Sequence, residues 1–201
     1  MTGVRVDLHV KVLDERVARR AKARGVDAVV YAPHFVRLPE IEARARRFSD
    51  DELAVVPARE VFAGPFWDRK HVLALDLDDP VPDFVSLEAA MAELRRQDAV
   101  VLAPHPGFMT VSLEREQIDR YRDLVAALEV YNPKHLSWHN RNARELAADL
   151  NIPRFASSYA HLRRTVGEAW TTFETAIESE ADLLAALREG AFRRVEHRRG
   201  L

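Results

Sequence analysis

Short apolar runs alternate with amphipathic stretches along most of this 201-residue chain, and this alternation restricts the fold more than any other feature. The apolar runs are rich in Val and Ala and mostly lack polar alternation, which is typical of strands covered on both faces. We expect strands at residues 4–8, 28–31, 53–57, 71–77, 99–103, 128–131, 154–156 and 171–173.

Helical periodicity fills the segments between these runs. We expect helices at residues 14–24, 39–48, 86–96, 113–127, 137–150 and 180–188. Gly25 follows a basic turn and predicts the end of the first helix, and Ser86 and Ser112 are N-cap candidates. Repeated strand–helix alternation predicts an α/β chain with a mostly parallel sheet, open or closed into a barrel. We expect a single domain with a core over about residues 4–190 and a charged tail at 191–201.

Composition excludes several classes of protein. The chain has no cysteine, which excludes disulfides, Cys-ligated zinc, iron–sulfur clusters and a thiol nucleophile. A formal net charge of −2 gives no global basic field for nucleic acid. No segment is long and apolar enough to span a bilayer, and the first residues lack a signal-peptide pattern, so we expect a cytoplasmic protein with no membrane partner. The sequence does not indicate an oligomeric state.

Metal-binding residue types follow most of the predicted strands, at the end where parallel α/β folds collect their function. The residues at these strand ends are His9, His34, Glu60, His105 and His161, with Asn132 and Lys134 after another strand. His71 is an exception because it stands at the start of its strand. Any one of these residues alone is more often a hydrogen-bonding side chain than a ligand. Their joint placement predicts one shared site, and His and carboxylate ligands suit a hydrolytic metal ion.

At these residues the sequence resembles the PHP (polymerase and histidinol phosphatase) family of metal-dependent phosphoesterases, over about residues 4–170. Asp7-Leu-His9-Val-Lys11 resembles the D-x-H-x-H motif, Pro33-His34 the end of T-D-H, and Glu60 the bridging glutamate. His71, His105-Pro106, the block Leu128 to Asn132, and Ser158-Tyr159-Ala-His161 followed by Val166-Gly167 resemble the later motifs in order. The resemblance implies a distorted (β/α)7 barrel of the PHP type.

The resemblance also implies a cluster of up to three metals. One complete site would consist of Glu60, His71 and His105. A second site would keep His9 and Glu60, and a third would keep His34 and His161, with Asp14 as a further candidate. We therefore expect one or two divalent ions, Zn, Mn or Fe. His135 and His139 are four residues apart and fit a solvated helix face better than a metal site, and His197 falls in the expected tail.

Three positions depart from the family pattern. Lys11, Pro33 and Tyr159 stand where the family has His, Asp and Asp. One hypothesis is that the Lys11 ammonium replaces part of the positive charge of a missing metal beside Glu60, and that Tyr159 donates a hydrogen bond or a proton. The alternative is a non-catalytic PHP-like binding or regulatory protein, such as an RNA-binding subunit similar to a protein of archaeal ribonuclease P. The near-neutral charge counts against RNA.

The interpretation we favour is a metal-dependent hydrolase that acts on a phosphate ester, with Lys11 and Tyr159 as candidate catalytic residues. An amidohydrolase would use similar ligands. The substrate should be small, because the chain has no obvious extra domain or basic groove. Arg59 and Lys134 are candidate substrate-binding residues, with Arg69, Lys70 and Arg163 as further candidates for a phosphate contact.

Overall fold

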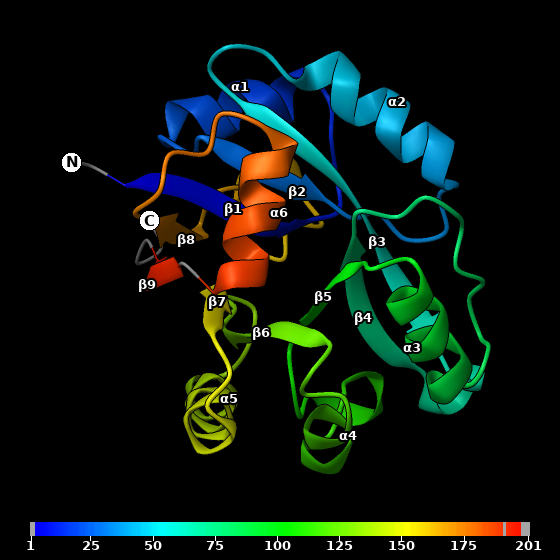
Figure 1. Ribbon diagram of the computed structural model, residues 1–201. Coiled ribbons are helices and arrows are strands. Elements are labelled where there is room, and N and C mark those ends of the chain that lie inside the picture. The colour runs from blue at the N-terminus through cyan, green and yellow to red at the C-terminus, as the bar shows by residue number, and fades with distance from the viewer. Residues whose placement is uncertain (1–2, 191, 198–201) are drawn as a thin grey trace.

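The computed structural model describes residues 3–190 and the backbone of residues 192–197 (Figure 1). Its strands are β1 (Val4–Val10), β2 (Ala28–Tyr31), β3 (Ala54–Ala63), β4 (Lys70–Leu75), β5 (Val100–Ala103), β6 (Val125–Tyr131), β7 (Arg154–Ala156), β8 (Ala169–Phe173) and β9 (Phe192–His197). Its α-helices are α1 (Glu15–Ala23), α2 (Leu38–Phe48), α3 (Leu87–Arg96), α4 (Arg115–Arg120), α5 (Ser137–Leu150) and α6 (Glu180–Glu189). Three short 3-10 helices are η1 (Phe66–Asp68), η2 (Met109–Val111) and η3 (Arg163–Thr165).

The described strands form one sheet in the order β7-β6-β5-β4-β3-β2-β1-β8-β9. The edge strands β7 and β9 lie next to each other, so the sheet curls into a nearly closed, distorted barrel. This confirms the predicted barrel class. The expected mostly parallel sheet is instead mixed: β1–β2, β2–β3, β5–β6 and β6–β7 are parallel, whereas β3–β4, β4–β5, β1–β8 and β8–β9 are antiparallel.

Three apolar clusters hold the barrel together. The interior cluster joins inward-facing residues such as Val56 and Leu73 to the buried face of α6, which closes one end of the barrel. Figure 1 shows α6 in front of the strands and the other helices around their outside. One outer cluster packs α1 and α2 on β1–β3, and the other packs α3, α4 and α5 on β4–β6. The end of the barrel away from α6 is left to loops and polar side chains.

Most elements lie within a few residues of their expected positions, with three corrections. Helix α4 ends at Arg120, because the apolar run after Tyr121 becomes the buried strand β6. Ser112 is not an N-cap: Glu114 caps α4 in a capping box with Gln117. Part of the expected charged tail is strand β9, which pairs with β8, while residues 191 and 198–201 of that tail lie outside the described residues.

The predicted end of the first helix is confirmed. Gly25 has a φ of +67°, a left-handed conformation that suits glycine just after a helix. None of the described helices has the length and apolarity needed to cross a membrane.

Candidate metal centre

Glu60 points into the barrel because alternate side chains of β3 face the interior and the outer apolar cluster. Val56 and Ala58 face the barrel interior, whereas Val61 and Ala63 belong to the outer cluster. Glu60 shares the inward direction of Val56 and Ala58, since successive side chains of a strand point to opposite faces. Its carboxylate is therefore buried at the end of the barrel opposite α6.

His71 reaches the same end because β4 runs antiparallel to β3. The register pairs His71 with Phe62, two residues beyond Glu60, so the start of β4 lies beside the end of β3. Leu73 and Leu75 face the interior, and His71 shares their direction. Its position at the start of a strand, an exception in the sequence pattern, follows from this reversed strand.

Three imidazoles converge on one oxygen of Glu60. The Oε1 atom lies 3.2 Å from His71 Nδ1, 3.4 Å from His105 Nε2 and 3.5 Å from His9 Nε2. Ligand atoms of Glu60, His71 and His105 all lie within 4.8 Å of one another. Tetrahedral ligands at a zinc–nitrogen distance of about 2.1 Å are separated by about 3.4 Å, so the observed spacing has the right scale.

Most of the polar atoms at this point have no hydrogen-bond partner. Glu60 Oε1, both ring nitrogens of His9 and His71, and Nε2 of His105 are buried and unsatisfied among the described residues. Each such atom costs about 1–3 kcal/mol in free energy of folding, so several of them around one point would be strongly destabilising without a ligand. Burial lowers the pKa of His71 to about 4, which keeps its ring neutral and able to bind a cation. The donor set therefore fits a divalent metal ion.

Ser112 fixes the orientation of His105, a role that the sequence did not indicate. Its hydroxyl lies 2.5 Å from the carbonyl oxygen of His105 and 3.1 Å from His105 Nδ1. The hydroxyl proton goes to a carbonyl, so its oxygen accepts the Nδ1 proton. The His105 Nε2 lone pair then faces Glu60 Oε1, an acceptor facing an acceptor, and this arrangement requires a cation or a proton between them.

Glu129 is a second buried carboxylate that the sequence analysis missed. It accepts hydrogen bonds from the His105 backbone amide at 2.8 Å and from the Ser157 hydroxyl, and its Oε1 lies 3.9 Å from His9 Nδ1. Burial alone would raise the pKa of Glu129, but its contact with His9 and the other nearby donors lower it to about 2. Glu129 is therefore an anion that orients His9 and the His105 loop behind the proposed ligands.

The other oxygen of Glu60 has a different environment. Lys11 Nζ donates to Oε2 at 2.6 Å, and His34 Nε2 also contacts Oε2. Burial lowers the pKa of Lys11 to about 8 against the opposing effect of Glu60. Burial would raise the pKa of Glu60, but Lys11 and the imidazoles hold it well below its usual range. One face of this carboxylate is thus paired with an ammonium, and the other faces unpaired imidazoles.

Tyr159, His161 and Lys134 form the rim of the site. The Tyr159 ring lies 4.8 Å from the His9 ring and 4.5 Å from the His161 ring, and His161 lies 5.5 Å from His34. Lys134 Nζ donates to the Tyr159 carbonyl at 2.6 Å and lies 3.2 Å from His161 Nδ1. Burial raises the pKa of the Tyr159 phenol, and Glu60 and Glu129 add to this effect, so it keeps its proton.

His105 and Tyr159 also share an unusual backbone conformation. Their φ angles are +37° and +46°, in the left-handed region that bulky residues rarely adopt. Such strain persists only where surrounding contacts enforce it, and it concentrates at functional sites.

Asp7 anchors the loop that carries Tyr159 and His161. Its carboxylate accepts from the backbone amides of Ser158 and Gly167, both at 2.9 Å. Gly167 has a φ of +70°, and a Cβ there would lie 3.0 Å from a methyl of Val26, so glycine is required. The first residue of the D-x-H motif therefore positions the rim and is not directed at the metal centre.

Several predicted site residues are not brought to this centre. Arg59 points out of the barrel and pairs with Asp83 at 2.8 Å, so its side chain does not face the metal centre. Asp14 caps α1 through Val17 N and pairs with Arg163 at 2.6 Å. Lys70 pairs with Asp68 at 3.0 Å.

Two other histidines lie beside the centre. The His135 ring stacks on Phe108 at 4.3 Å and lies 6.0 Å from His105. The His139 ring stacks on Trp138 at 3.4 Å. Burial lowers the pKa of His135 to about 4. His135 is therefore not the solvated helix-face residue that the sequence favoured.

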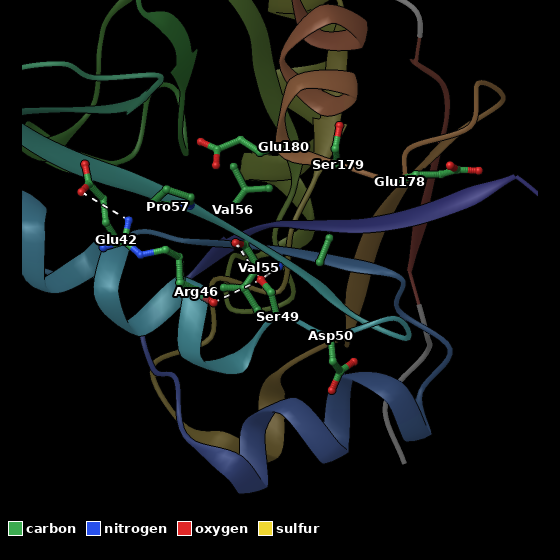
Figure 2. A pocket seen from close by; sticks show the side chains of 12 residues that line it. Glu42, Arg46, Ser49, Asp50, Val55, Val56, Pro57, Glu178, Ser179 and Glu180 are labelled. Carbon is green, nitrogen blue, oxygen red and sulfur yellow. Dashed lines mark hydrogen bonds and ion pairs between the residues drawn. The ribbon is translucent and has the colours of Figure 1, made fainter.

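A cleft of about 580 Å³ lies elsewhere, between α2, the start of β3 and the start of α6 (Figure 2). Its charged groups are exposed and several have partners: Arg46 lies 3.8 Å from Glu42, and Asp50 pairs with Lys22 at 2.5 Å. Figure 2 shows Glu178 and Glu180 at its rim without converging ligand atoms. The cleft contains none of the predicted site residues.

Comparisons with known proteins agree with the fold. The PHP-associated family model matches residues 137–192. No curated protein shows significant sequence similarity to this chain.

Three solved structures share the architecture. PsfC from Pseudomonas syringae is 21% identical with a TM-score of 0.72, covering 98% of this chain and 91% of its own. A Bifidobacterium adolescentis protein assigned as a metal-dependent phosphoesterase is 14% identical with a TM-score of 0.63. The match covers 90% of this chain and 96% of that protein. An amidohydrolase from Chromobacterium violaceum, solved with bound sulfate and no metal, is 15% identical with a TM-score of 0.62. The match covers 90% of this chain and 96% of that protein. At these identities the likeness establishes the fold and confirms the predicted PHP-type barrel.

Proposed function

We propose that this chain, whose fold is PHP-like, is a metal-dependent hydrolase that cleaves a phosphate ester of a small molecule. One observation carries the proposal: acceptor atoms of Glu60, His71 and His105 lie within 4.8 Å of one another in a buried cluster and have no hydrogen-bond partner among the described residues. The positioning of His105 by Ser112 and of His9 by Glu129 supports a built centre, since metal ligands are held in this way.

Glu60, His71 and His105 would hold the ion, and His9 would be a fourth ligand or a hydrogen-bonding neighbour. When bound, a divalent ion supplies Lewis acidity and lowers the pKa of water at the site. Zn, Mn and Fe all accept such ligands. The protein supplies the remaining organisation: buried surroundings, a fixed tautomer of His105 and a carboxylate whose second oxygen is already paired with an ammonium.

Lys11 would act in place of a second metal. Its ammonium lies 2.6 Å from Glu60 Oε2, on the side away from His71 and His105. A fixed positive charge there holds Glu60 ionised and adds positive potential near a phosphoryl group as negative charge develops. One ion is therefore the stoichiometry that we propose.

The rim residues would bind the phosphate and the leaving group. Tyr159 keeps its phenolic proton and can donate to a phosphoryl oxygen or to the leaving oxygen. Lys134 adds a cation beside Tyr159, and its position agrees with the proposed role in substrate binding. His161 holds its Nδ1 against Lys134 and the Tyr159 carbonyl, which leaves Nε2 for a proton or a ligand.

Metal analysis of the purified protein tests this proposal directly. We expect about one equivalent of Zn, Mn or Fe, and we expect His105→Ala to lose at least nine-tenths of it. His139→Ala is the matched control, because His139 stacks on Trp138 and not on the ligand set, and it should keep its metal. A protein with only trace metal, or equal losses in both variants, would contradict the proposal.

Activity is the second test. The metal-loaded protein should hydrolyse p-nitrophenyl phosphate, and Tyr159→Phe should lower kcat with little change in metal content. Loaded protein that binds RNA in a salt-dependent manner without any turnover would favour the non-catalytic alternative.

A further inference from the structure

A row of aromatic rings runs from the metal centre to the surface. The Phe62 ring lies 4.2 Å from the ring of the proposed ligand His71 and 5.1 Å from His34. Beyond it, Phe35 lies 5.0 Å from Phe62, and Phe84 lies 6.3 Å from Phe62. Phe62 belongs to β3, whereas Phe35 and Phe84 come from two different loops, and the three rings meet on one side of the metal centre.

The outer rings are exposed to solvent. Phe35 is 63% exposed, Phe66 is 65% exposed and Phe84 is 42% exposed. Phe66 lies 6.0 Å from Phe84, and Phe35 stacks on Phe84 at 6.2 Å with an angle of 26° between the planes. Isolated exposed aromatics are ordinary, but a contiguous exposed group beside a catalytic centre marks a binding surface.

A guanidinium completes this group. The Arg69 side chain lies 5.7 Å over the Phe62 ring and 5.0 Å over the Phe66 ring. A guanidinium stacks on the face of a flat ring as well as it pairs with an anion.

The backbone holds two of these rings in strained conformations. Phe35 and Phe84 have φ angles of +53° and +65°, which for bulky residues is a genuine departure from normal preferences. The Phe84 conformation is enforced by its neighbours: Phe84 N donates to the Phe62 carbonyl at 2.6 Å, and Asp83 accepts from Phe62 N at 3.0 Å. Arg59 holds Asp83 from the other side. Such enforcement is expected where ring placement matters for binding.

We propose that Phe35, Phe62, Phe66 and Phe84, with Arg69, form an aromatic subsite that binds a flat aromatic or heteroaromatic ring of the substrate. This inference rests on the proposed function, because it places the ring of the substrate next to the phosphate at the metal centre. A flat ring can stack on the exposed faces of Phe35 and Phe84 and under the guanidinium, whereas a puckered aliphatic ring of equal size cannot.

Binding of two matched phosphonates to the metal-loaded protein tests the aromatic subsite. Benzylphosphonate and cyclohexylmethylphosphonate have the same anionic group and similar size but differ in flatness, and neither can be hydrolysed at its P–C bond as an ester. We expect calorimetry to show about tenfold tighter binding of benzylphosphonate. Phe84→Leu and Phe35→Leu should reduce this preference to less than threefold and leave the affinity for inorganic phosphate unchanged.

Trp138→Leu is the matched control, because Trp138 is also an exposed aromatic residue but lies on α5, outside the subsite. It should keep the full preference. Equal binding of the two phosphonates would overturn the aromatic subsite. If inorganic phosphate still binds in that case, the proposed function stands and only the subsite fails. If neither phosphate nor either phosphonate binds, both fail. Thermal unfolding of each variant confirms that it is folded.

Discussion

The two polar regions of this protein differ in what their charged groups contact. The Figure 2 cleft is roomy, and its carboxylates are exposed to water or paired with nearby cations. The metal centre is a tight cluster in which Glu60, His71 and His105 are buried and face one another without partners. Uncompensated burial of polar atoms is the costly feature, and it identifies the centre as the place where a ligand is needed.

The fold explains why the two regions differ. Helix α6 fills one end of the barrel with leucines, and the Figure 2 cleft lies outside that plug, at the amino-terminal end of β3. The opposite end receives the ends of β1, β3, β5 and β6 and the start of β4, so side chains from distant segments meet there.

Two lysine–carboxylate pairs, one from each region, should differ most in their contribution to the free energy of unfolding. Lys11 pairs with Glu60 at 2.6 Å in a buried place, and Lys22 pairs with Asp50 at 2.5 Å where both groups are partly exposed. We expect Lys11→Met to lower the free energy of unfolding of the metal-free protein by about 3 kcal/mol, because it leaves the buried Glu60 carboxylate without its ammonium partner. Lys22→Met should cost much less, because exposed ion pairs contribute little to stability. Urea unfolding of the two variants measures both values.

Lys11→His tests the same lysine through the metal content of the protein. If the ammonium stands in for a metal ion, an imidazole at the same position should raise the metal content from about one equivalent toward two. Elemental analysis measures this. Equal stability losses in the two Met variants, together with unchanged metal content in Lys11→His, would show that the Lys11 pair has no special role.

The sequence predicted the barrel and the gathering of His9, Glu60, His71 and His105 because apolar runs and strand-end positions are local signals. The strand ending at Glu60 was expected to stop at residue 57, so Arg59 and Glu60 both appeared as loop residues at the mouth. Strand β3 in fact continues to Ala63, and alternation sends Arg59 outward. The reversal of β4 was also hidden, since a sequence pattern does not show strand direction.

Other parts of the centre left weaker signals. Glu129 lies within the apolar run Leu128-Glu129-Val130, and a charged residue inside a buried strand should have indicated a partnered group. Ser112 was interpreted as a helix cap, which is the usual role of serine at such a position. The aromatic subsite gave no signal at all, because Phe35, Phe66 and Phe84 lie in separate loops that meet only in the folded chain.

Replacing Arg59 should have an intermediate effect on the free energy of unfolding. The experiment decides whether Arg59 binds substrate, as the sequence suggested, or stabilises the fold through Asp83. Arg59 and Asp83 are mostly buried, so Arg59→Gln should lower the free energy of unfolding by about 2 kcal/mol and leave the metal content unchanged. The control is Arg95→Gln, whose partner Asp123 is an exposed carboxylate at 2.7 Å, and we expect a clearly smaller loss of stability. Loss of phosphate binding by Arg59→Gln without any loss of stability would restore the substrate-binding role.

Replacing Glu180 in the Figure 2 cleft should have the smallest effect on the free energy of unfolding. Burial by neighbouring atoms raises its pKa, and the carboxylates of Asp76 and Glu42 add to the effect. A carboxyl group whose pKa is higher in the folded chain than in the unfolded chain stabilises the fold below the unfolded pKa and loses that contribution as pH rises through the folded value. Glu180→Gln should therefore be more stable than the natural chain at pH 7, and this advantage should vanish at about pH 3–4.

Because Glu180 is exposed, the gain should be at most about 0.5 kcal/mol and should shrink in 1 M salt. Denaturant unfolding at the two pH values and two salt concentrations measures it. Glu180 also lies in the first turn of α6, where the helix dipole favours a negative charge. A loss of stability in Glu180→Gln at pH 7 would mean that the dipole outweighs repulsion within the cleft. The cleft would then be an electrostatically relaxed surface, and the contrast with the strained metal centre would be sharper still.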